Sequence, residues 1–139
     1  PCRIILLAVN VVVYPVPSGR RCYNLGKAIR KAVDHFDDNI NVQIWGTGGM
    51  SHQLQGRRAG LINQDWDNRF LERLADNPEE LADIPHIEYV RETGSEGIEK
   101  VMWLVMRGAL GSKVRELHRH YHVPASNTAV GHIVLESQS

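Results

Sequence analysis

The glycine-rich stretch "WGTGGMSHQLQG" (residues 45–56) runs directly into a Ser-His pair. Such loops can cradle phosphate, but this one lacks the Lys-Ser/Thr of a P-loop and the glycine spacing of the dinucleotide fingerprint. Two interpretations of His52 remain. The glycines could form a tight turn in which His52 is only a hydrogen-bonded loop residue. Alternatively, His52 could act as an acid and base, because imidazole titrates near neutral pH.

The segment "GSEGIE" (residues 94–99) places two carboxylates before a long apolar run. We expect Ser95 to cap a helix, so that Glu96 and Glu99 share one face of its first turn and complement the helix dipole. The residues that follow Glu99 are largely apolar, so its carboxylate needs a cation, and a metal ion is one solution. The pattern leaves open whether Glu99 serves the helix dipole or a metal.

Three histidines alternate in "HRHYH", at His118, His120 and His122. In a strand they would share one face, which invites a metal-site interpretation. However, three parallel side chains along one strand do not easily converge on one ion. We therefore expect these histidines to be solvated or paired with neighbouring side chains.

A short turn sequence, "PASN", follows at residues 124–127. Ser126 and Asn127 are common turn residues. Their hydroxyl and amide groups could equally bind a carboxylate or hydroxyl of a small ligand. Taken alone, the pattern does not separate the two roles.

The elements that must position these residues begin with an Ile- and Val-rich run at residues 3–15, typical of a strand buried on both faces. Asn24 could cap a helix, and residues 41–46 predict a second strand. Strand, helix, strand is the order of a βαβ unit, where ligands gather beyond the carboxyl ends of the strands. The His52 loop follows such an end. The apolar positions of the expected helix are Leu25, Ile29, Ala32, Val33 and Phe36.

The rest of the chain predicts three helices and two closing strands. The helices fall at residues 63–77, 78–84 and 98–110, the last apolar nearly all round, and the strands at 113–124 and 128–137. No repeat, low-complexity tract or linker divides the chain, so we expect one α/β domain over residues 1–139, a mixed sheet with flanking helices.

The amino-acid composition of the chain argues against several classes of function. The 139 residues carry 16 basic and 16 acidic side chains, so no net field favours nucleic acid or an anionic membrane. Two cysteines do not make a disulfide framework, and residues 4–13 are too short to cross a bilayer. We expect a soluble cytoplasmic protein. The chain enters an apolar run directly after Pro-Cys-Arg. A truncated polypeptide would begin in this way, and so would a natural start whose methionine has been removed; we expect truncation.

Taken together, the motifs resemble a known family, the class III extradiol ring-cleaving dioxygenases. The resemblance rests on "RRCYNLGKAIRKAV", "GTGGMSHQLQG", "INQDWDNRFLE", "ETGSEGIEKVMWLVMRGAL" and "YHVPASNTAVGHIVLE", in that order. The resemblance is strongest to the catalytic beta subunits that cleave protocatechuate, and the subunits that cleave gallate are also similar. It covers nearly all of this chain but only about the C-terminal half of such a subunit.

The resemblance implies non-haem Fe(II), held by two histidines and one glutamate, that cleaves a catechol acid such as protocatechuate with dioxygen. Glu99 matches the glutamate ligand, His52 the acid/base histidine, and Ser126 and Asn127 the substrate contacts. The two histidine ligands belong to the N-terminal half, so we expect this chain alone to be inactive. The family also implies an oligomer and a small alpha subunit over the active site.

Two alternatives stand beside this interpretation. The chain could be a non-catalytic, metal-free member of the same fold that acts as a binding protein. A hydrolase that uses Ser51 with His52 is the remoter one, because adjacent side chains point apart too readily to form a nucleophile-base pair.

Overall fold

A two-stranded antiparallel hairpin closes the chain, in a computed structural model that describes residues 3–138. Strand β1 (Val114–His122) pairs with β2 (Val130–Ser137), from Val114 opposite Ser137 to His122 opposite Val130. The register shifts between Glu116 and His118. Both closing strands were predicted, and their ends lie within two residues of the expected ones. The "PASN" turn joins them, with Asn127 in the left-handed region at φ 54°, a conformation that asparagine tolerates.

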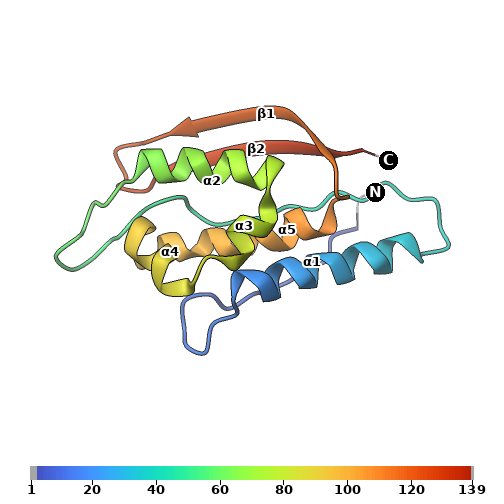
Figure 1. The fold of residues 1–139 in the computed structure, drawn as a ribbon, viewed down its shortest axis with the longest axis horizontal. Helices are drawn as coiled ribbons and strands as arrows, with labels where there is room; N and C mark the ends of the chain where they lie inside the picture. Colours follow the sequence, from blue (N-terminus) through green and yellow to red (C-terminus); the bar gives the residue numbers. More distant parts are fainter. Residues whose placement is uncertain (1–2, 139) are drawn as a thin grey trace.

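Helices fill the space on one side of this hairpin. Figure 1 shows β1 and β2 along one side of the molecule, α2 beneath them, α5 in the middle and α1 along the opposite side. The arrangement confirms the predicted class, a mixed α/β fold with flanking helices. Within the described residues, no helix is long and apolar enough to cross a membrane.

Helix α1 (Gly19–Asp34) begins earlier than predicted. The hydroxyl of Ser18 accepts a hydrogen bond from the backbone N–H of Arg21 and caps the helix, so the cap predicted at Asn24 is wrong. The buried face consists of Gly19, Cys22, Tyr23 and Gly26. This face packs on α5 (Trp103–Ala109), whereas Leu25 of the expected apolar face is exposed.

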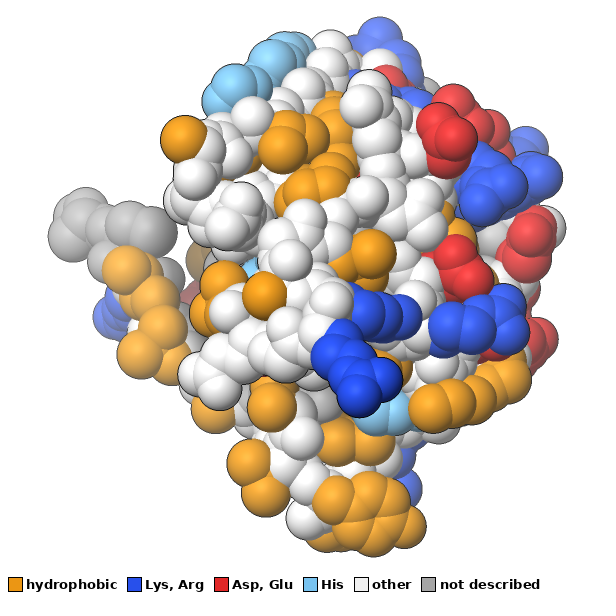
Figure 2. Space-filling model, turned by 90° about the vertical axis from the view of Figure 1, so that its left-hand side faces the viewer, with side chains coloured by type: hydrophobic (Ala, Val, Ile, Leu, Met, Phe, Trp, Pro, Cys, Tyr) orange, Lys and Arg blue, Asp and Glu red, His pale blue; other side chains and the backbone are white. Residues whose placement is uncertain are grey.

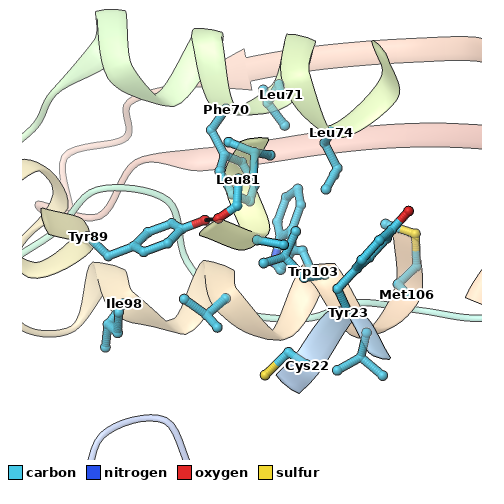
Figure 3. Packing of buried hydrophobic residues seen from close by; sticks show 14 of the residues in the cluster. Cys22, Tyr23, Phe70, Leu71, Leu74, Leu81, Tyr89, Ile98, Trp103 and Met106 are labelled. Atoms are coloured by element: carbon cyan, nitrogen blue, oxygen red, sulfur yellow. Dashed lines mark hydrogen bonds between the residues drawn. The ribbon is translucent and has the colours of Figure 1, made fainter. Parts of the chain in front are cut away.

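Helices α2 (Gln64–Asp76) and α3 (Pro78–Asp83) lie where the sequence predicts them. The side chain of Asn63 accepts a hydrogen bond from the N–H of Trp66 and caps α2, and Pro78 is the first residue of α3. The α2 residues Trp66, Phe70, Leu71 and Leu74 enter the core. Figure 3 shows several of them packed against side chains from α1, α4 and α5.

The region predicted as one helix, residues 98–110, consists of a 3₁₀ helix followed by an α-helix. Helix α4 (His86–Thr93), which we did not predict, ends at Gly94, where φ is 92°. A 3₁₀ helix η1 (Gly97–Met102) then leads into α5. Ser95 caps neither helix, since its hydroxyl donates to the side chain of Glu96 instead. All seven residues of α5 are buried, as the apolar pattern predicted.

The two strands predicted at residues 3–15 and 41–46 are absent, so the expected βαβ unit is wrong. Both segments are irregular, with a bend at residues 12–15, and Val9, Val11 and Ile44 reach the core. Most of their other apolar side chains are exposed, Ile5 by 94% and Trp45 by 81%. A strand buried on both faces needs neighbouring strands and covering layers. No part of residues 3–138 pairs with either segment in a ladder.

Candidate active site

The glycine loop that precedes His52 passes between two of the predicted site residues. A methyl group added at Gly48 would lie 2.9 Å from Cβ of Glu99. One added at Gly49 would lie 2.6 Å from Cε1 of the His52 ring. Gly48 also has φ 128°, which side chains rarely adopt. The glycines are therefore required by close packing, and they bring the segments of Glu99 and His52 against the same loop.

Backbone hydrogen bonds hold this loop on both sides. The N–H of Met50 donates to the carbonyl of Ala129 (3.0 Å), and the N–H of Ala129 donates to the carbonyl of Ser51 (3.1 Å). The N–H of His52 donates to the carbonyl of Thr93 (2.8 Å). Met50, Ser51 and His52 are buried as a result. The loop is fixed to both the end of α4 and the start of β2.

His52 is held in one tautomer. Its Nδ1 lies 2.9 Å from the carbonyl oxygen of Met50, and the residue is 6% exposed. A carbonyl oxygen only accepts hydrogen bonds, so Nδ1 carries the hydrogen. In the neutral ring Nε2 then has the free lone pair, which is the form that a general base requires.

Glu99 lies half-buried on η1. Its Oε2 accepts a hydrogen bond from the backbone N–H of Gly49 at 3.0 Å. This contact fixes the carboxylate against the loop and leaves Oε1 without a hydrogen-bonded partner among residues 3–138. Such a carboxylate suits one position of a metal site that combines two histidines with one carboxylate.

The remaining ligands of such a site are not provided by the described part of the chain. No group of three His, Cys, Asp or Glu side chains within residues 3–138 is arranged to hold a metal ion. His118, His120 and His122 lie exposed on β1. The ring centroids of His118 and His132 are 5.5 Å apart, and those of His120 and His122 are 6.4 Å apart.

The turn that carries Ser126 and Asn127 lies next to the loop. Thr128, the residue that follows them, forms an isolated antiparallel bridge with His52. The side chains of Ser126 and Asn127 are exposed. The structure therefore gathers the segments of His52, Glu99 and this turn around residues 48–52, although they are far apart in the sequence.

A buried ionic cluster beneath the loop was missed by the sequence analysis. Asp67 and Lys100, which are fully buried, form an ion pair. The carboxylate of Asp67 also accepts hydrogen bonds from Ser51 and Tyr121. Burial lowers the pKa of Lys100 to about 8, and the Asp67 charge opposes that shift. The sequence did contain a signal for this cluster, because each of the two charged residues lies among apolar ones. Asp67 follows Trp66, and Lys100 lies within "IEKVMW".

The Ser51 hydroxyl and the His52 ring have different hydrogen-bond partners. The Ser51 hydroxyl donates to Asp67 Oδ2 at 2.6 Å and accepts from the N–H of Asn63 at 2.8 Å, while His52 Nδ1 faces Met50. The hydroxyl is completely buried. The Ser51–His52 hydrolase hypothesis is therefore wrong.

Two surface hollows lie away from this loop. One, of about 240 Å³, is lined by residues of α2 and α3 together with Ile84. The other, of about 380 Å³, lies beside α1 and the end of α5. Neither is lined by His52 or Glu99.

Comparisons with protein families and with known proteins both identify similar proteins. Residues 1–131 match the family described as the catalytic LigB subunit of aromatic ring-opening dioxygenase. The chain is 40% identical over 138 residues to a gallate dioxygenase of Pseudomonas putida. That alignment covers 99% of this chain and 40% of the relative, so the chain spans about two fifths of the length of that curated protein.

Proposed function

This chain belongs to the LigB family of catalytic subunits of aromatic ring-opening dioxygenases, and on that premise we propose that the whole protein cleaves a catechol acid beside its two hydroxyl groups. The family assignment confirms the resemblance of the sequence motifs. The observation that carries the proposal is the gathering of Glu99, His52 and the Ser126–Asn127 turn around one loop.

We assign Glu99 as the carboxylate ligand of a non-haem Fe(II). The hydrogen bond from Gly49 to Oε2 supports this role, since it orients the carboxylate and leaves Oε1 for the metal. When bound, Fe(II) would hold the catechol oxygens and dioxygen together and supply the redox chemistry of ring opening. Two histidine ligands would come from the part of the longer polypeptide that precedes this chain.

His52 is proposed as the acid and base of the reaction. Its neutral ring presents Nε2 as an acceptor, so it can remove a proton from a hydroxyl group of the substrate. The Met50 carbonyl then stabilises the charged ring, because it accepts the Nδ1 hydrogen throughout. The same Nε2–H could later return the proton to an oxygen atom of the substrate.

Ser126 and Asn127 are proposed to bind the substrate. Their exposed hydroxyl and amide groups lie on a turn that the Thr128 bridge fixes beside His52. A carboxylate or hydroxyl group on the ring could accept hydrogen bonds from them. Protocatechuate and gallate both carry a carboxylate opposite their hydroxyl groups, and both are candidate substrates. The gallate dioxygenase match favours testing gallate as well.

Further protein is proposed to complete the site. The exposed apolar side chains of residues 4–7, 12–14 and 40–45 support a covering by more of the polypeptide or by another subunit. Figure 2 shows hydrophobic side chains exposed across one end of the molecule. The proposed partners are the N-terminal half, a small alpha subunit and further copies in an oligomer.

The proposal is tested with the natural full-length polypeptide, loaded anaerobically with Fe(II) and mixed with protocatechuate or gallate and then with oxygen. We expect oxygen uptake and a ring-opened product. No turnover of any catechol acid by the iron-loaded full-length protein would instead favour the metal-free binding protein.

A further inference from the structure

A single buried carboxylate receives hydrogen bonds from three segments of the chain. The N–H of Ser51 donates to both oxygens of Asp67, at 3.1 and 3.0 Å, and the Ser51 hydroxyl donates to Oδ2 at 2.6 Å. The Tyr121 hydroxyl donates to Oδ2 at 3.0 Å, and the Lys100 ammonium donates to Oδ1. We call these four residues, Ser51, Asp67, Lys100 and Tyr121, the Asp67 cluster.

Each donor of the Asp67 cluster lies close in sequence to a proposed site residue. Ser51 precedes His52, and Lys100 follows Glu99. Tyr121, near the end of β1, lies five residues before Ser126. Asp67 itself is fixed within α2, whose neighbouring residues Trp66 and Phe70 form part of the core. One rigid helix thus holds all three segments that carry the site.

We propose that Asp67 is a positioning residue, which sets the places of His52, Glu99 and the Ser126–Asn127 turn relative to one another. The inference rests on the proposed function, since these residues matter jointly only if they share one reaction. Asp67 acts through Ser51, Lys100 and Tyr121, and no direct contact with substrate is required.

Burial of this ion pair is hard to explain by stability alone. Removing two charges from water is costly, and apolar residues of similar volume often replace such a pair without loss of stability. Lys100 gains some compensation, because its ammonium lies 4.6 Å from the Trp66 ring centroid and 5.5 Å from that of Phe70. What an apolar pair could not supply is a set of directed hydrogen bonds to three separate segments.

Three variants of the natural full-length protein each remove one interaction of the Asp67 cluster: the Ser51 hydrogen bond, the Tyr121 hydrogen bond or the Lys100 ion pair. Ser51→Ala removes the hydroxyl beside His52, and we expect kcat to fall about tenfold while iron retention is unchanged. Tyr121→Phe loosens the turn, and KM should rise about tenfold with little change in kcat. Asp67→Asn combined with Lys100→Met removes both charges together, so no buried ion is left unpaired, and Fe(II) should bind about tenfold more weakly.

Tyr89→Phe is the matched control. The Tyr89 hydroxyl is buried and donates to the Leu81 carbonyl at 2.8 Å, outside the Asp67 cluster. This variant should lose thermal stability but keep kcat, KM and iron affinity. If the three cluster variants behave like this control, with a lower Tm and unchanged parameters per folded molecule, Asp67 is only structural and the proposal is overturned.

Hydrogen exchange tests the inference without enzyme activity. The cluster variants should speed amide exchange in the site segments to which they connect, residues 48–53, 97–101 and 123–129, whereas Tyr89→Phe should affect α3 and α4. Unchanged exchange in the three segments would overturn the positioning role even if the wild-type protein turns over substrate. If the wild type is inactive while exchange responds as expected, the proposed function fails and the positioning geometry stands.

Discussion

His52 derives its proposed chemistry from one hydrogen bond. The Met50 carbonyl fixes the hydrogen on Nδ1, so that Nε2 is free. The sequence showed a histidine beyond a glycine run but left two roles open. The tautomer could not be predicted from it, because the conformation of residues 50–52 is held by residues distant in the sequence. The Met50 N–H donates to the Ala129 carbonyl, and the His52 N–H donates to the Thr93 carbonyl.

We predict that His52→Ala lowers kcat by about 10²- to 10⁴-fold, the usual contribution of a general acid or base. Iron content should stay at the wild-type value, because His52 is not a ligand in our assignment. Steady-state kinetics and metal analysis of the full-length protein measure both. His86→Ala, at an exposed histidine of α4, is the control and should have no effect. Loss of iron in His52→Ala would contradict the assigned role.

Glu99 and Glu96 permit a matched comparison of two nearby carboxylates. Glu99→Gln should abolish iron retention, because the amide replaces a charged ligand. Glu96→Gln should retain iron. The Glu96 carboxylate is bound by the Ser95 hydroxyl and the Leu54 N–H, which hold its pKa below the usual range. Iron stoichiometry after gel filtration distinguishes the variants, and equal iron content in both would disprove the ligand assignment.

Among the helices and strands, local sequence patterns correctly predicted the elements whose formation depends mainly on their own residues. The apolar face of α2 predicted that helix, and two strand-like segments joined by the short "PASN" turn predicted the hairpin. Residues 3–15 and 41–46 have strand composition but lack pairing partners within the described chain. Ser18 instead of Asn24 caps α1, through its contact with the N–H of Arg21.

The approach of α1 to α5 depends on two glycines. A methyl group at Gly26 would lie 2.1 Å from the Val105 carbonyl oxygen, and one at Gly108 would lie 2.2 Å from that of Tyr23. We therefore predict that Gly26→Ala destabilises the protein by about 1–3 kcal/mol through overpacking. Leu25→Ala, at the exposed neighbour, should cost less. Urea unfolding measures both, and a larger loss for Leu25→Ala would mean that the helix presents the face expected from the sequence.

Cys22 lies in the same α1–α5 contact and predicts a pH dependence. Burial raises the pKa of its thiol from 9.0 to about 11. The unfolded chain therefore loses this proton first, so the contribution to stability is complete below pH 9 and is lost as the pH rises towards 11. Chemical unfolding at pH 8 and 11 should show a smaller loss for Cys22→Ala than for wild type; an equal loss would refute it.

For the whole molecule, the sequence predicted the fold class correctly, but only two of the four expected strands form a sheet within the described residues. The Asp67 cluster and the gathering of the site segments arise from tertiary packing between α2, η1 and β1, which no local pattern encodes. The apolar side chains at residues 4–7 and 12–14 are exposed. Their composition suits burial, and the covering by further protein proposed above would bury them.

The central claim is ring opening by dioxygen, and isotope labelling tests it most directly. The full-length, Fe(II)-loaded protein is given protocatechuate or gallate under ¹⁸O₂, and the product is quenched rapidly for mass spectrometry. Our account predicts a ring-opened product that carries both atoms of the labelled dioxygen. An intact ring, whether unchanged or hydroxylated, would contradict it.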